Sequence, residues 1–145
     1  MYDDILVPTD GSTAAEEAIT HAVDVASQYG ARLHALYVVD VGPYVTMEAG
    51  SEMVLNALQE EGEQAVKQVE SAADEAGVEV QTAVVTGTAF REIVDYVDSN
   101  DVDLVVMGTH GRKGIDRYLL GSVTERVVRS VDVPVMTVRQ RSAES

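Results

Sequence analysis

The segment ILVPTDGSTAAEEAITHAVDVASQYG, residues 5–30, contains one complete strand, turn and helix. Its first three residues are a continuous apolar run that Pro8 ends, which predicts a short strand buried on both faces. Apolar residues then recur at helical spacing up to Gly30, the expected stop of a helix. Thr13 and Glu16 have the spacing of a capping box at the start of this helix. The segment is therefore predicted to open a parallel α/β fold.

The same unit is repeated along the rest of the chain. Further strands are predicted at residues 33–39, 78–85, 102–107 and 135–138, and further helices from about residue 50 to Gly77, around Phe90, Ile93, Val94 and Val97, and around Val123, Val127, Val128 and Val131. Strands that alternate with helices pair in parallel through right-handed crossovers. We predict an α/β fold with a doubly wound, Rossmann-like sheet of five parallel strands in the order 3-2-1-4-5, covered by helices on both faces.

The length of 145 residues is most simply that of one domain, with its core at about residues 3–139 and a short disordered tail at about 142–145. The first residues lack the basic and apolar segments of a secretion signal. No run of eighteen apolar residues occurs in the chain. We therefore expect a soluble, cytoplasmic protein.

The formal charge of −15 sets limits on the partners. A chain this acidic repels nucleic acid and anionic membranes, so neither is expected as a general partner. Two lysines stand against 25 acidic residues, a balance typical of proteins adapted to high salt. The chain has no cysteine, which excludes disulfides and thiolate metal sites, and its three histidines do not have metal-ligand spacing.

Two loops mark the expected position of a binding site. In open parallel sheets the ligand crevice lies beyond the carboxyl ends of the strands, where the strand order reverses. The first strand ends in Pro8-Thr9-Asp10-Gly11 and the fourth ends in MGTHG, residues 107–111. These two ends are neighbours in the order 3-2-1-4-5, so the site is predicted between them.

The stretch GTHGRKGIDRYLLGS, residues 108–122, carries four glycines and three basic side chains in this acidic chain. Glycines let backbone N–H groups come close to phosphate oxygens. Ser122 and Glu125 have capping-box spacing, so a helix is predicted to begin here with its N–H groups and positive dipole end facing the loop. Five of the ten basic residues lie between residues 112 and 129. The combination indicates a phosphate site, although neither GxxxxGK[ST] nor GxGxxG is present.

The pattern Gly108-x2-Gly111-x9-Gly121-Ser122 resembles the ATP-binding motif of the universal stress protein family, and the Pro8-Thr9-Asp10 ending resembles that family's first strand. The likeness covers nearly the whole chain. It implies a nucleotide-responsive binding and signalling module of the stress response that holds ATP with a divalent cation, Mg or Mn. It also implies a homodimer that pairs through the last strand, residues 133–138, an apolar edge.

Carried over to this chain, the resemblance assigns a role to each position of the motifs. The ending of the first strand, Pro8, Thr9 and Asp10, would face the nucleoside, Val38 would lie against adenine, and Met107 and Gly108 would border the ribose. Backbone N–H groups would hold the phosphates at Gly111, Gly121, Ser122, Val123 and Thr124. The family pattern does not constrain the loop that begins at Arg112, but the charge of Arg112 is expected to attract it to the phosphates.

Alternative readings stay open at several of these positions. The glycines are also typical of ordinary turns, Ser122 of a helix cap, and Asp10 of a turn that follows a strand. His21 and His34 are expected to be structural or exposed. His110 lies in the glycine loop, but the sequence places no nucleophile or carboxylate beside it. An enzyme that hydrolyses ATP slowly or transfers an adenylyl group, and an interaction protein that binds no nucleotide, are therefore the alternatives to a binding module.

Overall fold

Strands and helices alternate without exception along the part of the chain that the computed structural model describes, residues 1–40, 51–109 and 121–139. The strands are β1 (Asp4–Pro8), β2 (Arg32–Val39), β3 (Val80–Thr86), β4 (Leu104–Gly108) and β5 (Val135–Val138), and the helices are α1 (Thr13–Tyr29), α2 (Ser51–Glu75), α3 (Ala89–Ser99) and α4 (Ser122–Ser130). These elements confirm the predicted sequence of units. The third and fourth strands begin two residues later than predicted.

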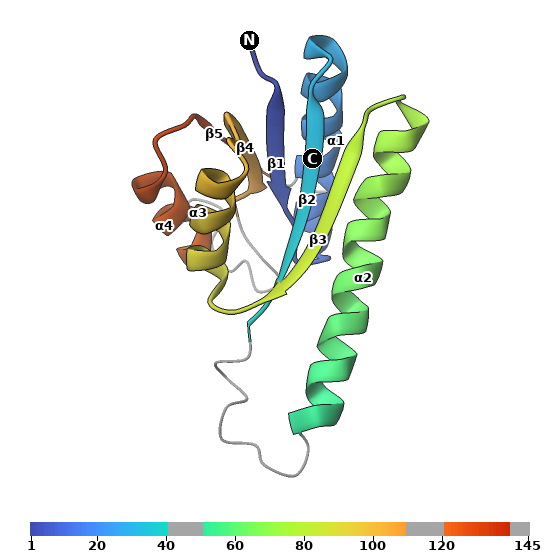
Figure 1. Cartoon of the computed structure of the whole chain (residues 1–145), viewed down its shortest axis with the longest axis vertical. Helices are drawn as coiled ribbons and strands as arrows, with labels where there is room; N and C mark the ends of the chain where they lie inside the picture. Colours follow the sequence, from blue (N-terminus) through green and yellow to red (C-terminus); the bar gives the residue numbers. More distant parts are fainter. Residues whose placement is uncertain (41–50, 110–120, 140–145) are drawn as a thin grey trace.

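The strands form one parallel sheet in the order β3-β2-β1-β4-β5 (Figure 1). In the register, Pro8 of β1 lies beside Leu36 of β2, and Gly108 of β4 lies beside Val138 of β5. The chain order reverses at β1, because β2 lies on one side of it and β4 on the other. The predicted α/β class and the order 3-2-1-4-5 are therefore confirmed.

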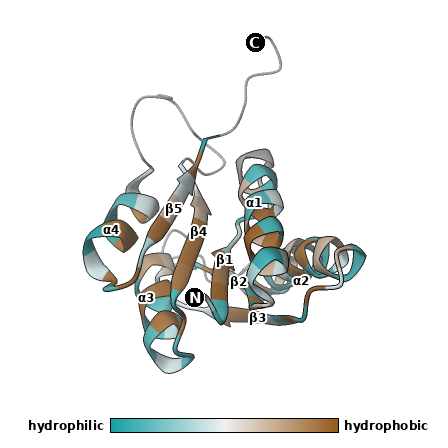
Figure 2. Ribbon diagram, turned by 90° about the horizontal axis from the view of Figure 1, so that it is seen from above, coloured by the Kyte–Doolittle hydropathy of each residue, from teal (hydrophilic) through white to brown (hydrophobic). Residues whose placement is uncertain are grey.

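Alternate residues of the strands face two separate hydrophobic cores. Odd-numbered residues of β2, from Leu33 to Val39, pack against α1 and α2, while Leu36 packs on the other face with Ile93 of α3 and Val127 of α4. Figure 2 shows the apolar strands between the two helix layers. Both faces of the central strands are buried, as expected of a parallel sheet.

Helix α1 begins one residue earlier than the predicted capping box implies. Ser12 is its N-cap, in an extended conformation, and its Oγ accepts a hydrogen bond from the N–H of Ala15. The prediction that Thr13 caps this helix is therefore wrong, because Thr13 is already in the first helical turn. Gly30 ends the helix in the left-handed conformation, with φ of 63°, which confirms the predicted stop.

The 25-residue helix α2 is longer than the strands it covers. At 1.5 Å per residue it spans about 37 Å, whereas the eight residues of β2 span about 26 Å. Its first turns extend past the carboxyl edge of the sheet (Figure 1). Met53 there is 79% exposed, and continuous burial of the helix against the sheet begins only around Gly62 and Ala65. No helix among the described residues is long and apolar enough to cross a membrane.

Candidate functional site

The residues that follow β1, Thr9 to Ser12, form a turn that is stabilised by hydrogen bonds from their own side chains. The Thr9 N–H donates to the carbonyl oxygen of Leu36 at 2.9 Å, and Thr9 Oγ1 accepts from the N–H of Gly11 at 3.1 Å. Asp10 Oδ1 accepts from the N–H of Ser12 at 2.9 Å, so the turn role expected for Asp10 is present. Gly11 has a φ of 79°, which favours glycine.

The ends of β2 and β4 lie on either side of this turn. Val38, half-buried, faces the α3 and α4 side of the sheet. Met107 on β4 is 6% exposed, and Gly108 follows it at the strand's last position. Pro8, Thr9, Val38, Met107 and Gly108 therefore come from three neighbouring strands and gather at one edge of the sheet.

Helix α4 begins at this same edge. Gly121 is its N-cap, with φ and ψ of −63° and 155°, and its carbonyl oxygen accepts the first helical hydrogen bond from Glu125 at 2.9 Å. Ser122 is therefore the first residue inside the helix and not the cap, so the predicted capping box of Ser122 and Glu125 is wrong. The Glu125 carboxylate instead lies 3.2 Å from Arg129 on the next turn. An α-helix leaves its first N–H groups without intrahelical acceptors, and here Ser122, Val123 and Thr124 carry them.

Two hydrogen bonds join the start of α4 to the end of β4. The Gly121 N–H donates to the carbonyl oxygen of Thr109, so this amide is already engaged within the protein. Thr124 Oγ1 donates to the carbonyl oxygen of Gly108 at 2.9 Å. This side-chain contact was not among the sequence-based predictions. The signal was present, because Thr124 is a polar residue three positions before buried Val127, on the same helical face.

The described residues bring together ten of the predicted site positions, and Gly111 and Arg112 lie outside them, as does His110. Arg126 lies over the ring of Phe90, 5.0 Å from its centroid, and so joins α4 to α3. Among the described residues, no group of three or more histidine, cysteine, aspartate and glutamate side chains is arranged to hold a metal ion. What the arrangement offers chemically is a set of backbone N–H donors at the start of α4, next to the end of β4.

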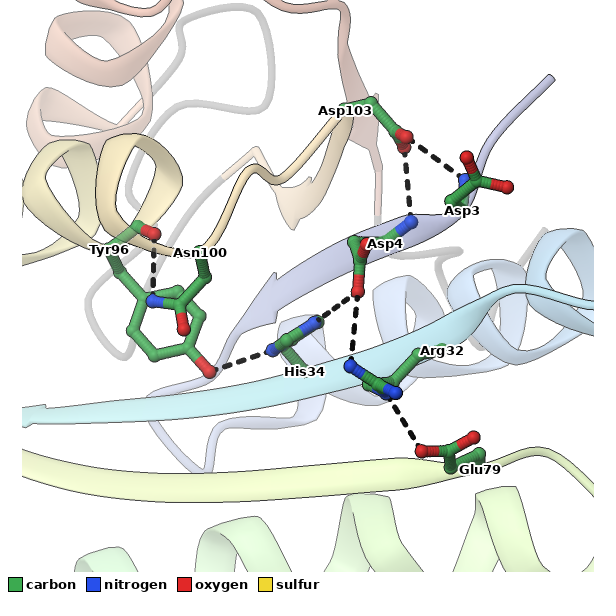
Figure 3. Close-up of polar contacts among 8 residues, drawn as sticks. All are labelled: Asp3, Asp4, Arg32, His34, Glu79, Tyr96, Asn100 and Asp103. Carbon is green, nitrogen blue, oxygen red and sulfur yellow. Dashed lines mark hydrogen bonds and ion pairs between the residues drawn. The ribbon is translucent and has the colours of Figure 1, made fainter.

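A second polar cluster lies at the opposite, amino end of the sheet (Figure 3). His34 on β2 is 2% exposed; its Nε2 lies 2.9 Å from Asp4 Oδ1, and its Nδ1 lies 2.8 Å from the hydroxyl of Tyr96 on α3. Arg32 contacts Asp4 at 3.8 Å and Glu79 at 2.8 Å. The hydrogen bond from Arg32 to Glu79 raises the pKa of Arg32. Both ring nitrogens of His34 are satisfied within the fold, which confirms its expected structural role, while His21 is exposed on α1.

Tyr96 makes this cluster sensitive to alkaline pH. Burial raises the pKa of the Tyr96 hydroxyl, and the Asp4 carboxylate raises it further. Because the pKa of Tyr96 is higher in the folded than in the unfolded state, its protonated hydroxyl contributes fully to the free energy of unfolding below the unfolded pKa of about 10. That contribution is lost as the pH rises through the folded pKa. We expect the free energy of unfolding to decrease above about pH 10, and Tyr96→Phe to make that decrease shallower. Urea titrations at pH 8 to 11 test this, and identical slopes for both proteins would contradict it.

Comparison with known proteins identifies the family. The model of the universal stress protein family matches residues 1–139. The chain belongs to the universal stress protein family. Universal stress protein MJ0531 of Methanocaldococcus jannaschii is 42% identical to it over 146 residues, which cover 99% of this chain and 86% of that protein. The resemblance seen in the motifs is therefore confirmed at the level of the family.

Solved structures share the fold of this family member. The structure of the hypothetical protein MJ0577, from the same organism, has a TM-score of 0.88 and 31% identity, and the match covers 99% of each chain. Two more distant universal stress proteins, one in complex with cAMP and one from Archaeoglobus fulgidus in complex with dAMP, each have a TM-score of 0.70, at 24% and 21% identity. The cAMP match covers 97% of this chain and 98% of the other, and the dAMP match 94% and 98%. At that distance the likeness concerns the fold.

Proposed function

We propose that this universal stress protein binds ATP, together with a divalent cation such as Mg or Mn, and that it acts as a nucleotide-responsive signalling module and not as an enzyme. One observation carries the proposal: the amino end of α4, with the N–H groups of Ser122, Val123 and Thr124, lies against the carboxyl end of β4. A helix N-terminus in this position favours phosphate through both its free donors and its dipole.

The remaining roles follow from the edge of the sheet. In this proposal adenine lies against Val38, and the ribose lies between the Pro8-Thr9-Asp10 turn and Met107-Gly108. Gly111 and Arg112 complete the phosphate site. The Gly121 N–H already donates a hydrogen bond to the Thr109 carbonyl oxygen. The proposed donors to phosphate are therefore the N–H groups of the three residues that follow Gly121. The two distant complexes also contain adenine nucleotides, the class of ligand proposed here.

We further propose that two copies pair through β5. This strand lies at one end of the sheet order, and the residues around it, 133–138, are apolar or half-buried at most positions. A strand of this kind offers unpaired backbone groups to a second copy. Sedimentation equilibrium tests this, because a dimer would have twice the mass of 15.6 kDa.

Calorimetric titration of the protein with ATP, ADP and AMP, in the presence of Mg²⁺, tests the function directly. Mass analysis of small molecules released from the heat-denatured protein tests whether a nucleotide co-purifies. A single-turnover assay for ADP and phosphate separates binding from hydrolysis. Absence of binding at millimolar ATP would overturn the proposal, and rapid product formation would overturn its non-enzymatic part.

Ser122→Pro is expected to weaken ATP binding about tenfold, because it removes one N–H donor to a charged phosphate. Proline is favoured at the first position of a helix, and Gly121 before it already has the extended conformation that proline requires. Helix α4 should therefore stay intact. Ser122→Ala keeps the N–H and removes only an exposed hydroxyl, so it serves as the matched control and should bind ATP as the wild type does. Equal affinities of the two variants would argue against a phosphate at this amide.

A further inference from the structure

Thr124 stands between the two halves of the proposed nucleotide site. Its side chain is 5% exposed, and its Oγ1 donates to the carbonyl oxygen of Gly108 at 2.9 Å. Gly108 is the last residue of β4, where the proposal puts the ribose, and Thr124 is in the first turn of α4, where it puts the phosphates. The hydroxyl therefore links the nucleoside side of the site to the phosphate side.

The acceptor of this bond is itself held by the sheet. Gly108 is paired in register with Val138 of β5, and the next residue, Thr109, donates its N–H to the Val138 carbonyl oxygen at 3.0 Å. The Thr109 carbonyl oxygen accepts from Gly121. Thus two adjacent carbonyl groups receive the two hydrogen bonds from the start of α4, and the peptide group that carries the first of them, Gly108–Thr109, is held by β5.

Helix α4 needs such an attachment because it is short. Nine residues make only about two and a half turns, and isolated helices of this length are marginal in water. Its fully buried residue, Val127, lies a turn further along, and partly buried Val123 and the contact of Arg126 with Phe90 add to the packing of the helix. The two hydrogen bonds at its beginning limit fraying of the first turn and so preserve the directions of its N–H groups.

We infer that Thr124 is a positioning residue that sets the phosphate-facing amides at a fixed distance from the nucleoside end of the site. The inference rests on the proposed function, and it adds a selective consequence. Loss of the hydroxyl weakens ligands that carry phosphates and leaves a nucleoside unaffected. A purely structural role for Thr124 would instead change both affinities together.

Calorimetry with ATP and with adenosine, on the full chain, tests this. Thr124→Val keeps the shape and the backbone N–H but removes the donor, and we expect ATP binding about tenfold weaker with adenosine binding changed by less than about twofold. Thr124→Ser restores the hydroxyl and should recover ATP affinity. Thr20→Val is the control, since Thr20 Oγ1 bonds the Glu16 carbonyl oxygen on an exposed part of α1.

The outcomes separate this inference from the proposed function. If the wild type does not bind ATP, the proposed function falls and the inference with it. If the wild type binds ATP and Thr124→Val binds it equally well, or loses ATP and adenosine to the same degree, only the inference falls. Should Thr124→Val not fold, amide exchange in the ligand-free wild type decides: the Gly121 amide is expected to exchange at least about tenfold more slowly than in an unstructured chain, and unprotected exchange overturns the inference.

Discussion

Replacement of Gly62 by valine is expected to lower the free energy of unfolding by about 2 to 3 kcal/mol. Gly62 is on the face of α2 that lies on the sheet, and a Cβ there would lie 2.6 Å from Cδ1 of Tyr37 and 3.0 Å from Cγ1 of Val84. The Tyr37 ring is 5% exposed, and its hydroxyl contacts Glu61 at 3.3 Å, so it has little room to move aside. The clash outweighs the better helix propensity of valine, which amounts to less than about 1 kcal/mol.

Denaturation in urea, followed by circular dichroism, measures this effect. Ser71→Val is the matched control, because Ser71 is exposed on the same helix and serine and valine have nearly equal helix propensities. The control should stay within about 0.5 kcal/mol of the wild type. A Gly62→Val protein as stable as the control would mean that α2 does not approach the sheet as closely as described.

His34→Leu is expected to destabilise the fold by about 2 to 3 kcal/mol, since it removes two buried hydrogen bonds, one of them to a carboxylate. Leucine fills most of the volume, so the loss reflects the bonds and not a cavity. Asp4 keeps its contact with Arg32, and its side chain is 23% exposed, which lets water replace part of what is lost. The loss of stability in His34→Leu is therefore expected to be smaller than the cost of leaving a fully buried charge without a partner.

The hydrogen-bond partners of His34 allow the contribution of these bonds to be distinguished from a general loss of packing. In a double-mutant cycle, Asp4→Asn and His34→Leu should be non-additive, with a coupling energy of about 1 kcal/mol or more. His21→Leu, at an exposed position of α1, is the control and should leave the unfolding midpoint nearly unchanged. Strict additivity of Asp4 and His34 would contradict the hydrogen bond between them.

The order of elements could be predicted because each strand is a short apolar run and each helix has a clear period. The turn glycine Gly30 was predictable for the same reason, since a left-handed residue is needed where α1 ends. Helix caps were predicted less well. At both Thr13 and Ser122 the correct N-cap is the residue before, Ser12 or Gly121. The glutamates at positions 16 and 125 favoured the later alignment, although serine and glycine are themselves common N-caps.

The candidate site was predictable to the extent that it depends on strand ends. Motif positions in Pro8-Thr9-Asp10 and Met107-Gly108 come together because parallel strands end at one edge. The spacing of Thr124 and Val127 indicated that Thr124 is buried, but the acceptors of the bonds from Gly121 and Thr124 were not predictable, since they depend on how far α4 is displaced along the sheet. The cluster around His34 was missed for a similar reason: it joins residues 4, 34 and 96, which only the strand register and the position of α3 bring together.

The projection of α2 beyond the sheet gives this chain a natural place for a reporter group. Asn56 is exposed in that projecting part, away from both cores, and the chain contains no cysteine. A cysteine introduced at this position would be the only thiol in the molecule, so a fluorescent dye would attach at this one position beyond the carboxyl edge of the sheet. The emission of the dye would then test the proposed nucleotide binding, without a label on the nucleotide itself.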